Sequence, residues 1–416
     1  MRSLRLALPP SLILLLMVSC AREAAPPTSA PPQSIDPFPL GTLDPLQPQL
    51  YPPNPDQFVV EVELGTDIGA IVDALEVEPI GVEEYSTHAV VLFAPAAGVT
   101  PANFLAFSGV KSSGPNDKVD IFAESGSLVI GFVGWGWEDS SGTGQNAFEG
   151  LNLTAVHNLA TGAGVRVGVV DTGADPDHPL LASRIEVLPP GTMESVETCN
   201  GEDDDGDGDI DEACSHGTFV AGEVAIVAPG ATIIPCRALN SDGVGSVLDV
   251  LRAMFHLAEQ DCDVINLSLS LSAYHEQFEG ILAGLQSRGI AVVAAAGNAG
   301  GRNPLFPGTS PYAVGAAAVD VTNTLASFSG GGPLINLGAP GVGVRSAFLG
   351  GGTGQASGTS MAAPIISGTI ALVIDHEQMS PLDAVDRVLT NAGDIIPWTA
   401  SESGAVDPMA SLMSTL

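Results

Sequence analysis

Between residue 57 and about residue 135, apolar and polar positions alternate in short runs. FVVEVEL has the two-residue period of a strand that buries one face, and HAVVLFA is also strand-like. TDIGAIVDALE starts with a capping Thr-Asp pair and continues with helical spacing, and TPANFLAF predicts a shorter helix. Further strand candidates are KVDIFAE and SLVIGF. The pattern predicts a small α+β unit, of a size that folds alone with marginal stability.

Beyond residue 150 the pattern changes to continuous apolar runs separated by helical segments. VRVGVVD and GIAVVAAAG are apolar along almost their whole length, as are ATIIPC and DVINLSLS. Such runs are typical of strands buried on both faces of a sheet. The helical segments between them include VLDVLRAMFHLAEQ and EQFEGILAGLQSRG. We therefore predict an α/β domain over residues 150–416, with a mainly parallel sheet covered by helices and its function at the carboxyl ends of the strands.

The first 56 residues have no core pattern. Arg2 and Arg5 precede a short apolar run ending in MVSC, which predicts an export signal over residues 1–20. The ending resembles a bacterial lipobox, in which Cys20 would be lipidated and would anchor the protein to the membrane. A plain secretory signal is the alternative. Residues 21–56 are rich in proline and predict an extended linker, and both interpretations place the protein outside the cytoplasm, where disulfides can form.

The charge of the chain is strongly negative. Its 416 residues include 48 acidic and 13 basic ones, giving a formal net charge of −35. This balance excludes the basic surface that nucleic-acid binding requires, so we expect no nucleic-acid partner. The general interpretation of this acidic excess is that it keeps the protein soluble. The more specific interpretation is that the acidic surface binds divalent cations.

The acidity is densest between Cys199 and Cys214, in CNGEDDDGDGDIDEAC. Carboxylates at alternate positions with a turn-forming Gly208 are typical of a Ca²⁺ loop, although the usual final Glu is replaced by Cys214. The expected calcium ligands are Asp203, Asp205, Asp207, Asp209, Asp211 and Glu212. A solvated acidic loop is the alternative. A disulfide between the two bracketing cysteines would add about 3 kcal/mol to stability; whether Cys236 and Cys262 pair is left open.

Three motifs follow one another in the order that a nucleophilic catalyst needs. DTGAD puts Asp171 at the end of a buried strand, SHGT puts His216 where a loop enters a helix, and SGTSMAAP puts Ser360 at a helix start. A serine hydroxyl needs a base within hydrogen-bond reach, and that base needs an orienting carboxylate. In AAAGNAG, Asn298 follows another strand, where its amide can donate to an oxyanion. The histidines that belong to no motif are expected to be structural: His88, His157, His178, His256, His275 and His376.

Together these motifs resemble the subtilisin family over about residues 150 to 395. The resemblance implies a subtilisin-like parallel sheet and a serine endopeptidase that acts on protein or peptide substrates, with Asp171, His216 and Ser360 as its triad and Asn298 in its oxyanion hole. It also implies substrate-binding positions at Gly245, Ser268, Leu269, Ser270 and Gly297. Ser270 stands where the family more often has glycine, so we expect a narrower primary specificity pocket.

The resemblance has further implications. Residues 57–135 take the place of a subtilase prodomain, a small ferredoxin-like chaperone and inhibitor, with an ordinary accessory domain as the alternative. The family's strong calcium loop is missing from this chain, and we expect the insertion at 199–214 to replace it, with Ca²⁺ neutralising the acids beside His216. The family's cis peptide bond would fall at Ser310–Pro311. The alternative function is a non-catalytic calcium-binding surface protein built on the same scaffold.

Overall fold

The computed structural model describes residue 40 and the ranges 43–121, 131–134, 146–189, 192–204, 206, 208–300, 303–393 and 404–413. The predicted signal with Cys20, most of the predicted linker, and two of the expected calcium ligands, Asp205 and Asp207, lie outside these residues.

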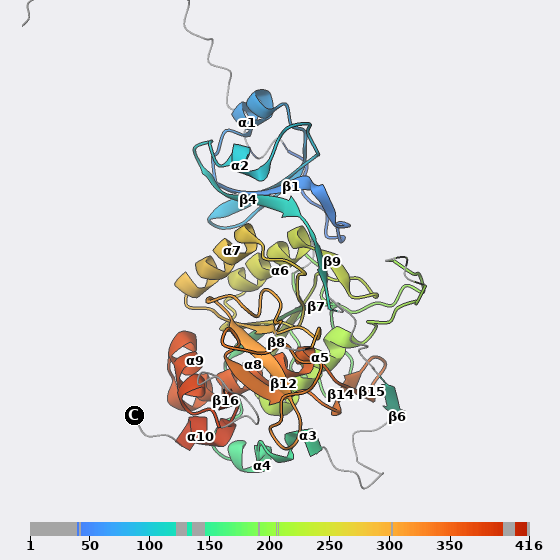
Figure 1. Cartoon of the computed structure of the whole chain (residues 1–416), viewed down its shortest axis with the longest axis vertical. Helices are drawn as coiled ribbons and strands as arrows, with labels where there is room; N and C mark the ends of the chain where they lie inside the picture. The colour runs from blue at the N-terminus through green and yellow to red at the C-terminus, as the bar shows by residue number, and fades with distance from the viewer. Residues whose placement is uncertain are drawn as a thin grey trace, which may run out of the picture. The chain divides into compact units, whose positions relative to one another are not determined.

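The N-terminal unit is a four-stranded antiparallel sheet with two helices in the order βαββαβ (Figure 1). Its strands lie in the order β2-β3-β1-β4, which is the ferredoxin-like arrangement that was predicted. Asp67 caps the first helix by accepting a hydrogen bond from the backbone N–H of Ala70, as the Thr-Asp start indicated. The elements are β1 (Asn54–Glu63), α1 (Ile68–Leu75), β2 (Pro79–Glu84), β3 (His88–Phe93), α2 (Pro101–Phe104) and β4 (Val110–Asn116).

Both faces of this small sheet are buried. Val60 and Val62 of β1 pack with Ile71 of α1 on one face. Val59, on the opposite face, and Val90 of β3 belong instead to the hydrophobic cluster of the larger domain. Strand β3 is buried along its whole length. Since adjacent side chains of a strand point to opposite faces, both faces of the sheet are covered at β3. The N-terminal unit is therefore packed onto the larger domain through a complete sheet face.

The larger domain contains the predicted parallel sheet. Seven strands lie in the order β16-β13-β12-β11-β10-β7-β8, and every adjacent pair is parallel. These strands are β7 (Arg166–Asp171), β8 (Thr232–Arg237), β10 (Val264–Leu267), β11 (Ala291–Ala295), β12 (Val314–Val319), β13 (Leu337–Pro340) and β16 (Gly404–Ala405). The prediction of an α/β domain is confirmed.

Helices cover both faces of the sheet (Figure 1). The hydrophobic cluster on one face includes α5 (His216–Val227), α8 (Thr359–Glu377) and α9 (Pro381–Thr390), and that on the other includes α6 (Val247–Glu259) and α7 (Glu276–Ser287). The remaining elements are β5 (Lys118–Asp120), β6 (Gly131–Gly134), α3 (Asn146–Glu149), α4 (Leu153–Val156), β9 (Val244–Ser246), β14 (Val344–Phe348), β15 (Gly352–Ala356) and α10 (Pro408–Met413). In the part of the chain that is described, α8 is long and apolar enough to cross a membrane, but 89% of that stretch is buried, so it is the core helix of the domain.

Two sequence-based expectations need correction. The predicted linker over 21–56 was expected to have no core, but Leu46 is 7% exposed and its N–H donates to the carbonyl of Val82 at 2.7 Å. The cis peptide bond lies at Phe306–Pro307 and not at Ser310–Pro311. Tertiary contacts decide which of two nearby X-Pro bonds is cis, and the dipeptides alone do not show it.

Helix α5 carries a carboxyl group that predicts a stability effect. Glu223 is fully buried and neither of its carboxyl oxygens has a hydrogen-bond partner within the described residues. Burial raises its pKa well above the usual range, so the folded chain keeps a proton that the unfolded chain releases. Stability is therefore lost as the pH rises from the unfolded pKa toward the folded one.

We expect Glu223→Gln to stabilise the protein at pH 8 by about 1–3 kcal/mol, because the amide removes the ionisable group that is desolvated on folding. At pH 4.5 the difference should be small. Urea unfolding of both chains at the two pH values checks this. Equal effects at both pH values would contradict it.

Candidate active site

The three motif residues lie at the predicted ends of their elements. Asp171 is the last residue of β7, His216 the first of α5, and Ser360 the second of α8. All three are at most 2% exposed. The Nδ1 atom of His216 lies 2.7 Å from Oδ1 of Asp171, which is a buried hydrogen bond. Within the described residues, Nε2 of His216 has no hydrogen-bond partner, and Oγ of Ser360 donates to the carbonyl of Ser268 at 3.3 Å. The structure therefore joins His216 to Asp171 but not to Ser360, a contact that often tightens only when substrate binds.

Two glycines allow the first two motifs to approach each other. A Cβ atom at Gly217 would lie 1.9 Å from the carbonyl oxygen of Gly173, so only glycine fits there. Gly173 has φ of +99°, and Ser215, just before the helix, has φ of +81°. These left-handed residues turn the chain sharply shortly after Asp171 and directly before His216. The glycines of DTG and HGT thus set the close packing on which the Asp171–His216 contact depends.

The backbone carbonyl of Ser360 is held by the side chain of Ser268. Pro364 lies inside α8 and has no N–H to donate to the carbonyl of Ser360, four residues earlier. Instead, Oγ of Ser268 donates to this carbonyl at 2.8 Å. The first turn of the helix is therefore held by a residue from the end of β10, and the backbone N–H of Ser360 belongs to the unpaired donors of a helix start.

Asn298 is oriented by the residue before the serine. Its Oδ1 accepts hydrogen bonds from the backbone N–H and the hydroxyl of Thr359, at 2.9 and 3.1 Å. Since the two ends of an amide point in opposite directions, its NH₂ group is directed away from Thr359. Gly297, with φ of +85°, donates its N–H to the same hydroxyl at 3.1 Å. The predicted oxyanion donor is thus fixed beside the helix that carries Ser360.

A segment of the chain itself lies along the predicted substrate-binding positions. Strand β5 pairs antiparallel with β9, with Val119 opposite Gly245. On its other side, Asp120 and Ser270 exchange two backbone hydrogen bonds, of 3.1 and 3.0 Å. The N–H of Ile121 then donates to the carbonyl of Gly243 at 3.2 Å. The tail of the N-terminal unit is therefore inserted as a middle strand between two segments of the larger domain, an arrangement typical of a bound peptide.

Comparison with known proteins gives the family. The sequence profile of the subtilase family matches residues 162–409. The chain belongs to the subtilase family. It is 32% identical over 257 residues to subtilisin E of Bacillus subtilis (58% of this chain, 64% of the relative) and 34% identical over 277 residues to halolysin of Haloferax mediterranei (63% and 52%). It is 35% identical over 233 residues to subtilisin BL of Lederbergia lenta (54% and 81%). It thus spans between about half and two thirds of the length of subtilisin E and halolysin.

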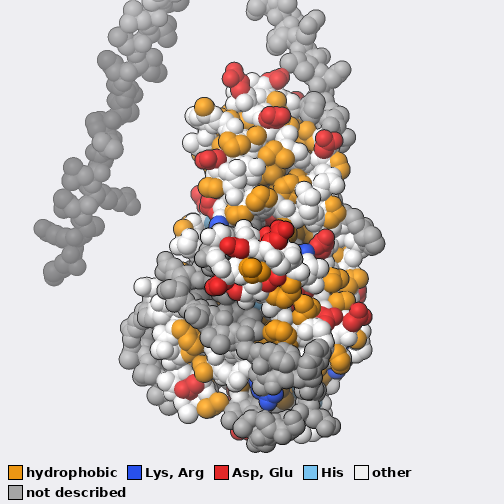
Figure 2. Space-filling view, turned by 90° about the vertical axis from the view of Figure 1, so that its right-hand side faces the viewer, with side chains coloured by type: hydrophobic (Ala, Val, Ile, Leu, Met, Phe, Trp, Pro, Cys, Tyr) orange, Lys and Arg blue, Asp and Glu red, His pale blue; other side chains and the backbone are white. Residues whose placement is uncertain are grey.

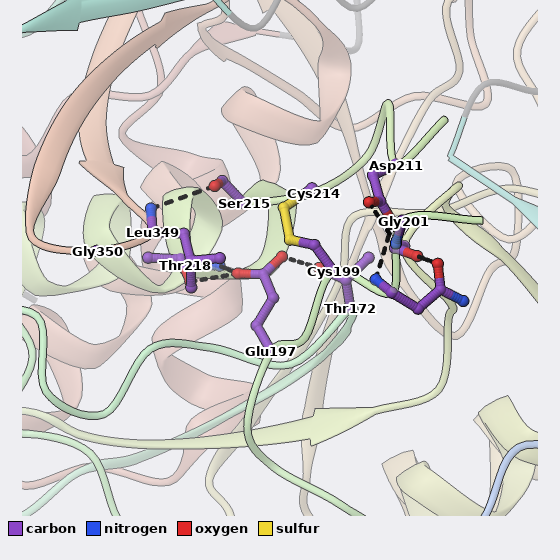
Figure 3. The surroundings of a disulfide bond; sticks show 12 residues. Thr172, Glu197, Cys199, Gly201, Asp211, Cys214, Ser215, Thr218, Leu349 and Gly350 are labelled. Carbon is purple, nitrogen blue, oxygen red and sulfur yellow. Dashed lines mark hydrogen bonds between the residues drawn. A yellow bond between two sulfur atoms is a disulfide. The ribbon is translucent and has the colours of Figure 1, made fainter. Parts of the chain in front are cut away.

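In this subtilase the acidic insertion is closed by the predicted disulfide, between Cys199 and Cys214 (Figure 3). Both oxygens of Asp211 accept backbone N–H groups, from Asn200 and Gly201, at 3.1 and 2.8 Å. Asp203 likewise accepts from the N–H groups of Gly206 and Gly208, at 2.7 and 3.1 Å. The loop is therefore wound around its own carboxylates.

The insertion is docked through a buried residue. Asp242, which is 0% exposed, accepts the backbone N–H groups of Asp204 and Asp211. It directly precedes Gly243, whose carbonyl holds the inserted tail. The loop is thus connected to the edge of the predicted substrate-binding site. In the described portion of the chain, no three His, Cys, Asp or Glu side chains converge as a metal site.

The surface and the other cysteines complete the description. Acidic side chains are spread over the face shown in Figure 2, where Lys and Arg are few. Cys236 and Cys262, whose state was left open, are buried free thiols, and burial raises the pKa of both.

Three acidic residues that hold parts of the structure together were not among the predicted residues. Glu197 is a buried carboxylate next to the disulfide, and Asp242 anchors the insertion. Glu83 of β2 forms an ion pair with Arg252 of α6 at 2.5 Å and contacts His256 at 2.6 Å. None of these residues lies in a recognisable motif. Their only sequence signal is a charged residue within or beside an apolar run.

Proposed function

We propose that this subtilase is an exported serine endopeptidase that hydrolyses peptide bonds through an acyl-enzyme. Ser360 attacks the peptide carbonyl, and His216 takes its proton and returns it to the leaving amine. Asp171 orients His216 and stabilises the imidazolium that forms. Asn298 and the backbone N–H of Ser360 donate to the oxyanion. The observation that carries the proposal is the buried Asp171–His216 hydrogen bond, together with a serine at the start of α8, a helix that shares a hydrophobic cluster with α5.

The direct test is reaction with a fluorophosphonate probe, which modifies only activated serines. We expect the processed protein to be labelled on Ser360 and to cleave denatured casein. A folded protein that is inert to the probe and to casein would favour the alternative, a non-catalytic surface protein that uses the subtilase scaffold for binding.

The same proposal includes synthesis as a zymogen. The N-terminal unit would act as a prodomain, because its sheet face is buried on the larger domain and its tail pairs with both predicted substrate-binding segments. The antiparallel pairing of Asp120 with Ser270 directs the chain toward Ser268, which contacts Ser360. We therefore expect the maturation cleavage to fall shortly after Ile121. If Cys20 is lipidated, this cleavage would release the catalytic domain from the membrane.

We further propose that the carboxylates of the insertion bind Ca²⁺. The alternate carboxylates favour a hard cation. Asp203 accepts hydrogen bonds from two backbone N–H groups of the insertion, which supports a loop that winds around its carboxylates. Such an ion would balance the repulsion among the carboxylates, while the disulfide and Asp242 hold the loop's ends in its absence.

Removal of calcium should then destabilise the protein. At a calcium concentration about 100 times the dissociation constant, binding contributes about 2.7 kcal/mol, so excess chelator should lower Tm and activity together. The double variant Asp203→Ala with Asp205→Ala should behave like the chelated protein. The matched control replaces two exposed acids of α7 and α9, as Glu276→Ala with Asp386→Ala, and should melt normally. Unchanged melting and full activity in excess chelator would rule out the site.

A further inference from the structure

Glu197 is a buried carboxylate that neither the motifs nor the triad explains. It is 4% exposed and lies two residues before the disulfide, in a segment that runs beside the chain after β7 (Figure 3). Ala174 pairs with this segment through two backbone hydrogen bonds, of 2.9 and 3.1 Å, to Ser195 and Glu197. A Cβ atom at Gly173 would lie 2.7 Å from the backbone nitrogen of Glu197. The glycine of the DTG motif therefore also makes room for this segment.

The carboxylate joins the two catalytic motifs. Its Oε1 accepts a hydrogen bond from the hydroxyl of Thr172 at 2.5 Å. Its Oε2 accepts from the backbone N–H of Thr218 at 3.0 Å and from the Thr218 hydroxyl. Thr172 directly follows Asp171, and Thr218 lies two residues after His216. One side chain thus ties the end of β7 to the first turn of α5.

Thr172 has a single hydroxyl proton, which two carboxylates can accept. Its oxygen accepts the N–H of Gly217 at 2.9 Å, so its own proton must go elsewhere. Oε1 of Glu197 lies 2.5 Å away, and Oδ1 of Asp171 lies 3.3 Å away. The proton therefore goes to Glu197 while that group is ionised. If Glu197 were neutral, the hydroxyl could turn toward Asp171 and withdraw charge from the carboxylate that supports His216.

Several titratable groups surround this network. Asp171 of β7 is bonded to His216 of α5, and Arg237 of β8, which pairs with Glu194, lies opposite Asp171 in the sheet. Asp175, in the loop after β7, donates its N–H to the Thr218 hydroxyl and accepts the N–H of Gly350 with its carboxylate. Burial, and to a smaller extent the charge of Asp171, raise the pKa of Glu197, while the hydrogen bonds from Thr172 and Thr218 lower it; the net pKa is about 7. Its charge is therefore able to change in the range where a histidine base works.

We propose that Glu197 is a positioning residue for the Asp171–His216 pair, and that its negative charge keeps the Thr172 hydroxyl from donating to Asp171, the carboxylate that supports the His216 imidazolium. This inference rests on the proposed catalytic function. Glu197 itself does not touch the substrate. It acts through Thr172 and Thr218, which its oxygens hold.

The test is Glu197→Gln in the full chain, compared with wild type after processing. Glutamine keeps the shape but removes the charge and has a single acceptor oxygen, so it cannot accept from both Thr172 and Thr218. We expect the acidic limb of the kcat/KM profile to move to lower pH by about 0.5–1 unit, and kcat on the plateau to fall about three- to tenfold, with KM unchanged. A profile that superimposes on wild type, with the same plateau, would overturn the proposal.

A matched control separates this effect from packing. Glu223→Gln changes another fully buried carboxylate of the same region, on α5, that has no hydrogen bond to the network in the described residues. It should leave the pH profile unchanged. If Glu197→Gln does not fold, Glu197→Asp replaces it, because the shorter side chain cannot hold both threonines and frees the Thr172 hydroxyl to donate to Asp171. The acidic limb should again move to lower pH, and adding Thr172→Val, which leaves no hydroxyl to turn, should return it to the wild-type position. A limb that stays shifted would contradict the route through Thr172.

A second readout does not depend on activity. In Ser360→Ala, the imidazole of His216 can be titrated by proton NMR and assigned by its loss in His216→Gln. Adding Glu197→Gln should lower the midpoint of that titration. A wild-type chain that is inert to fluorophosphonate, but shows this shift, would refute the proposed function and keep the positioning role. An active chain without the shift would support the proposed function and refute the positioning role of Glu197.

Discussion

Ser360→Ala should abolish both the hydrolysis of added peptides and the cleavage of the chain by itself. In the proposed mechanism the hydroxyl of Ser360 forms the covalent bond with the substrate, and the hydroxyl of Ser268, which contacts it, is engaged with the Ser360 carbonyl. The expected loss in kcat is about 10⁶-fold, a magnitude measured on subtilisin itself. The intact mass of the purified chain, with and without the substitution, measures the second effect directly.

Wild type should lose an N-terminal piece that ends shortly after Ile121, whereas Ser360→Ala should keep its full mass. The matched control is Ser367→Ala in the same helix, because Ser367 is equally buried and donates to Asn266 at 3.1 Å. This control should still process itself. If both wild type and Ser360→Ala stay whole, either the site is inactive or the N-terminal unit is no prodomain.

Glu83→Ala should loosen the hold of the N-terminal unit on the catalytic domain by about 10²–10³-fold. Arg252 is 1% exposed; it pairs with Glu83 across the boundary between the two units and with Asp249 of its own helix. Removing one partner of a buried ion pair costs about 3–5 kcal/mol, because the remaining charge is left desolvated. In the proposed zymogen, we expect a shorter delay between cleavage of the chain and the appearance of protease activity. We also expect the cleaved N-terminal piece to separate from the catalytic domain during size-exclusion chromatography.

Acid should weaken the same contact. Burial raises the pKa of Glu83, but the His256 hydrogen bond and the charge of Arg252 outweigh it, and the net pKa is lowered. The stabilisation from this group is therefore complete above its free pKa and is lost as the pH falls through the lowered value. His88, packed against Phe255 at 4.2 Å, acts in the same direction, because burial lowers its pKa to about 4. Released His88 takes up a proton below its free pKa of 6.5, which favours dissociation.

The control for this prediction is Glu186→Gln. Glu186 also pairs with an arginine, Arg166, at 2.9 Å, but both residues belong to the catalytic domain. Its loss should change neither the delay nor the acid dependence. Equal retention of the cleaved piece in wild type and Glu83→Ala, at pH 7 and at pH 4.5, would show that the ion pair does not hold the two units together.

Patterns that arise from one segment could be predicted from the sequence, whereas contacts between segments could not. Continuous apolar runs indicated β7, β8, β10 and β11, because a strand buried on both faces needs apolar residues at every position. Strand β4, with the sequence VKSSGPN, gave no such signal, since its partner β1 supplies most of the apolar surface.

The candidate site shows the same division. Asp171, His216, Ser360 and Asn298 each lie in a motif with its own turn glycine or helix start, so their positions could be predicted. Glu197 lies in no motif, and its role comes from Thr172 and Thr218, which are distant in sequence. The expectation that the insertion's acids act beside His216 overlooked this carboxylate, which precedes the insertion and contacts the helix that His216 begins.

The sheet of the N-terminal unit, covered on both faces, has a consequence for how activation ends. Val59 and Val90 are buried only while that sheet rests on the larger domain. Once the connecting peptide is cleaved and the N-terminal unit dissociates, one apolar face of its small sheet is exposed to solvent, and we expect the unit to unfold. If this piece is the proposed prodomain, the unfolded peptide becomes a substrate of the endopeptidase, and the proposed inhibitor is destroyed by the enzyme that it inhibits. Activation is then a one-way event: each molecule can be switched on once and cannot be switched off again by the same piece.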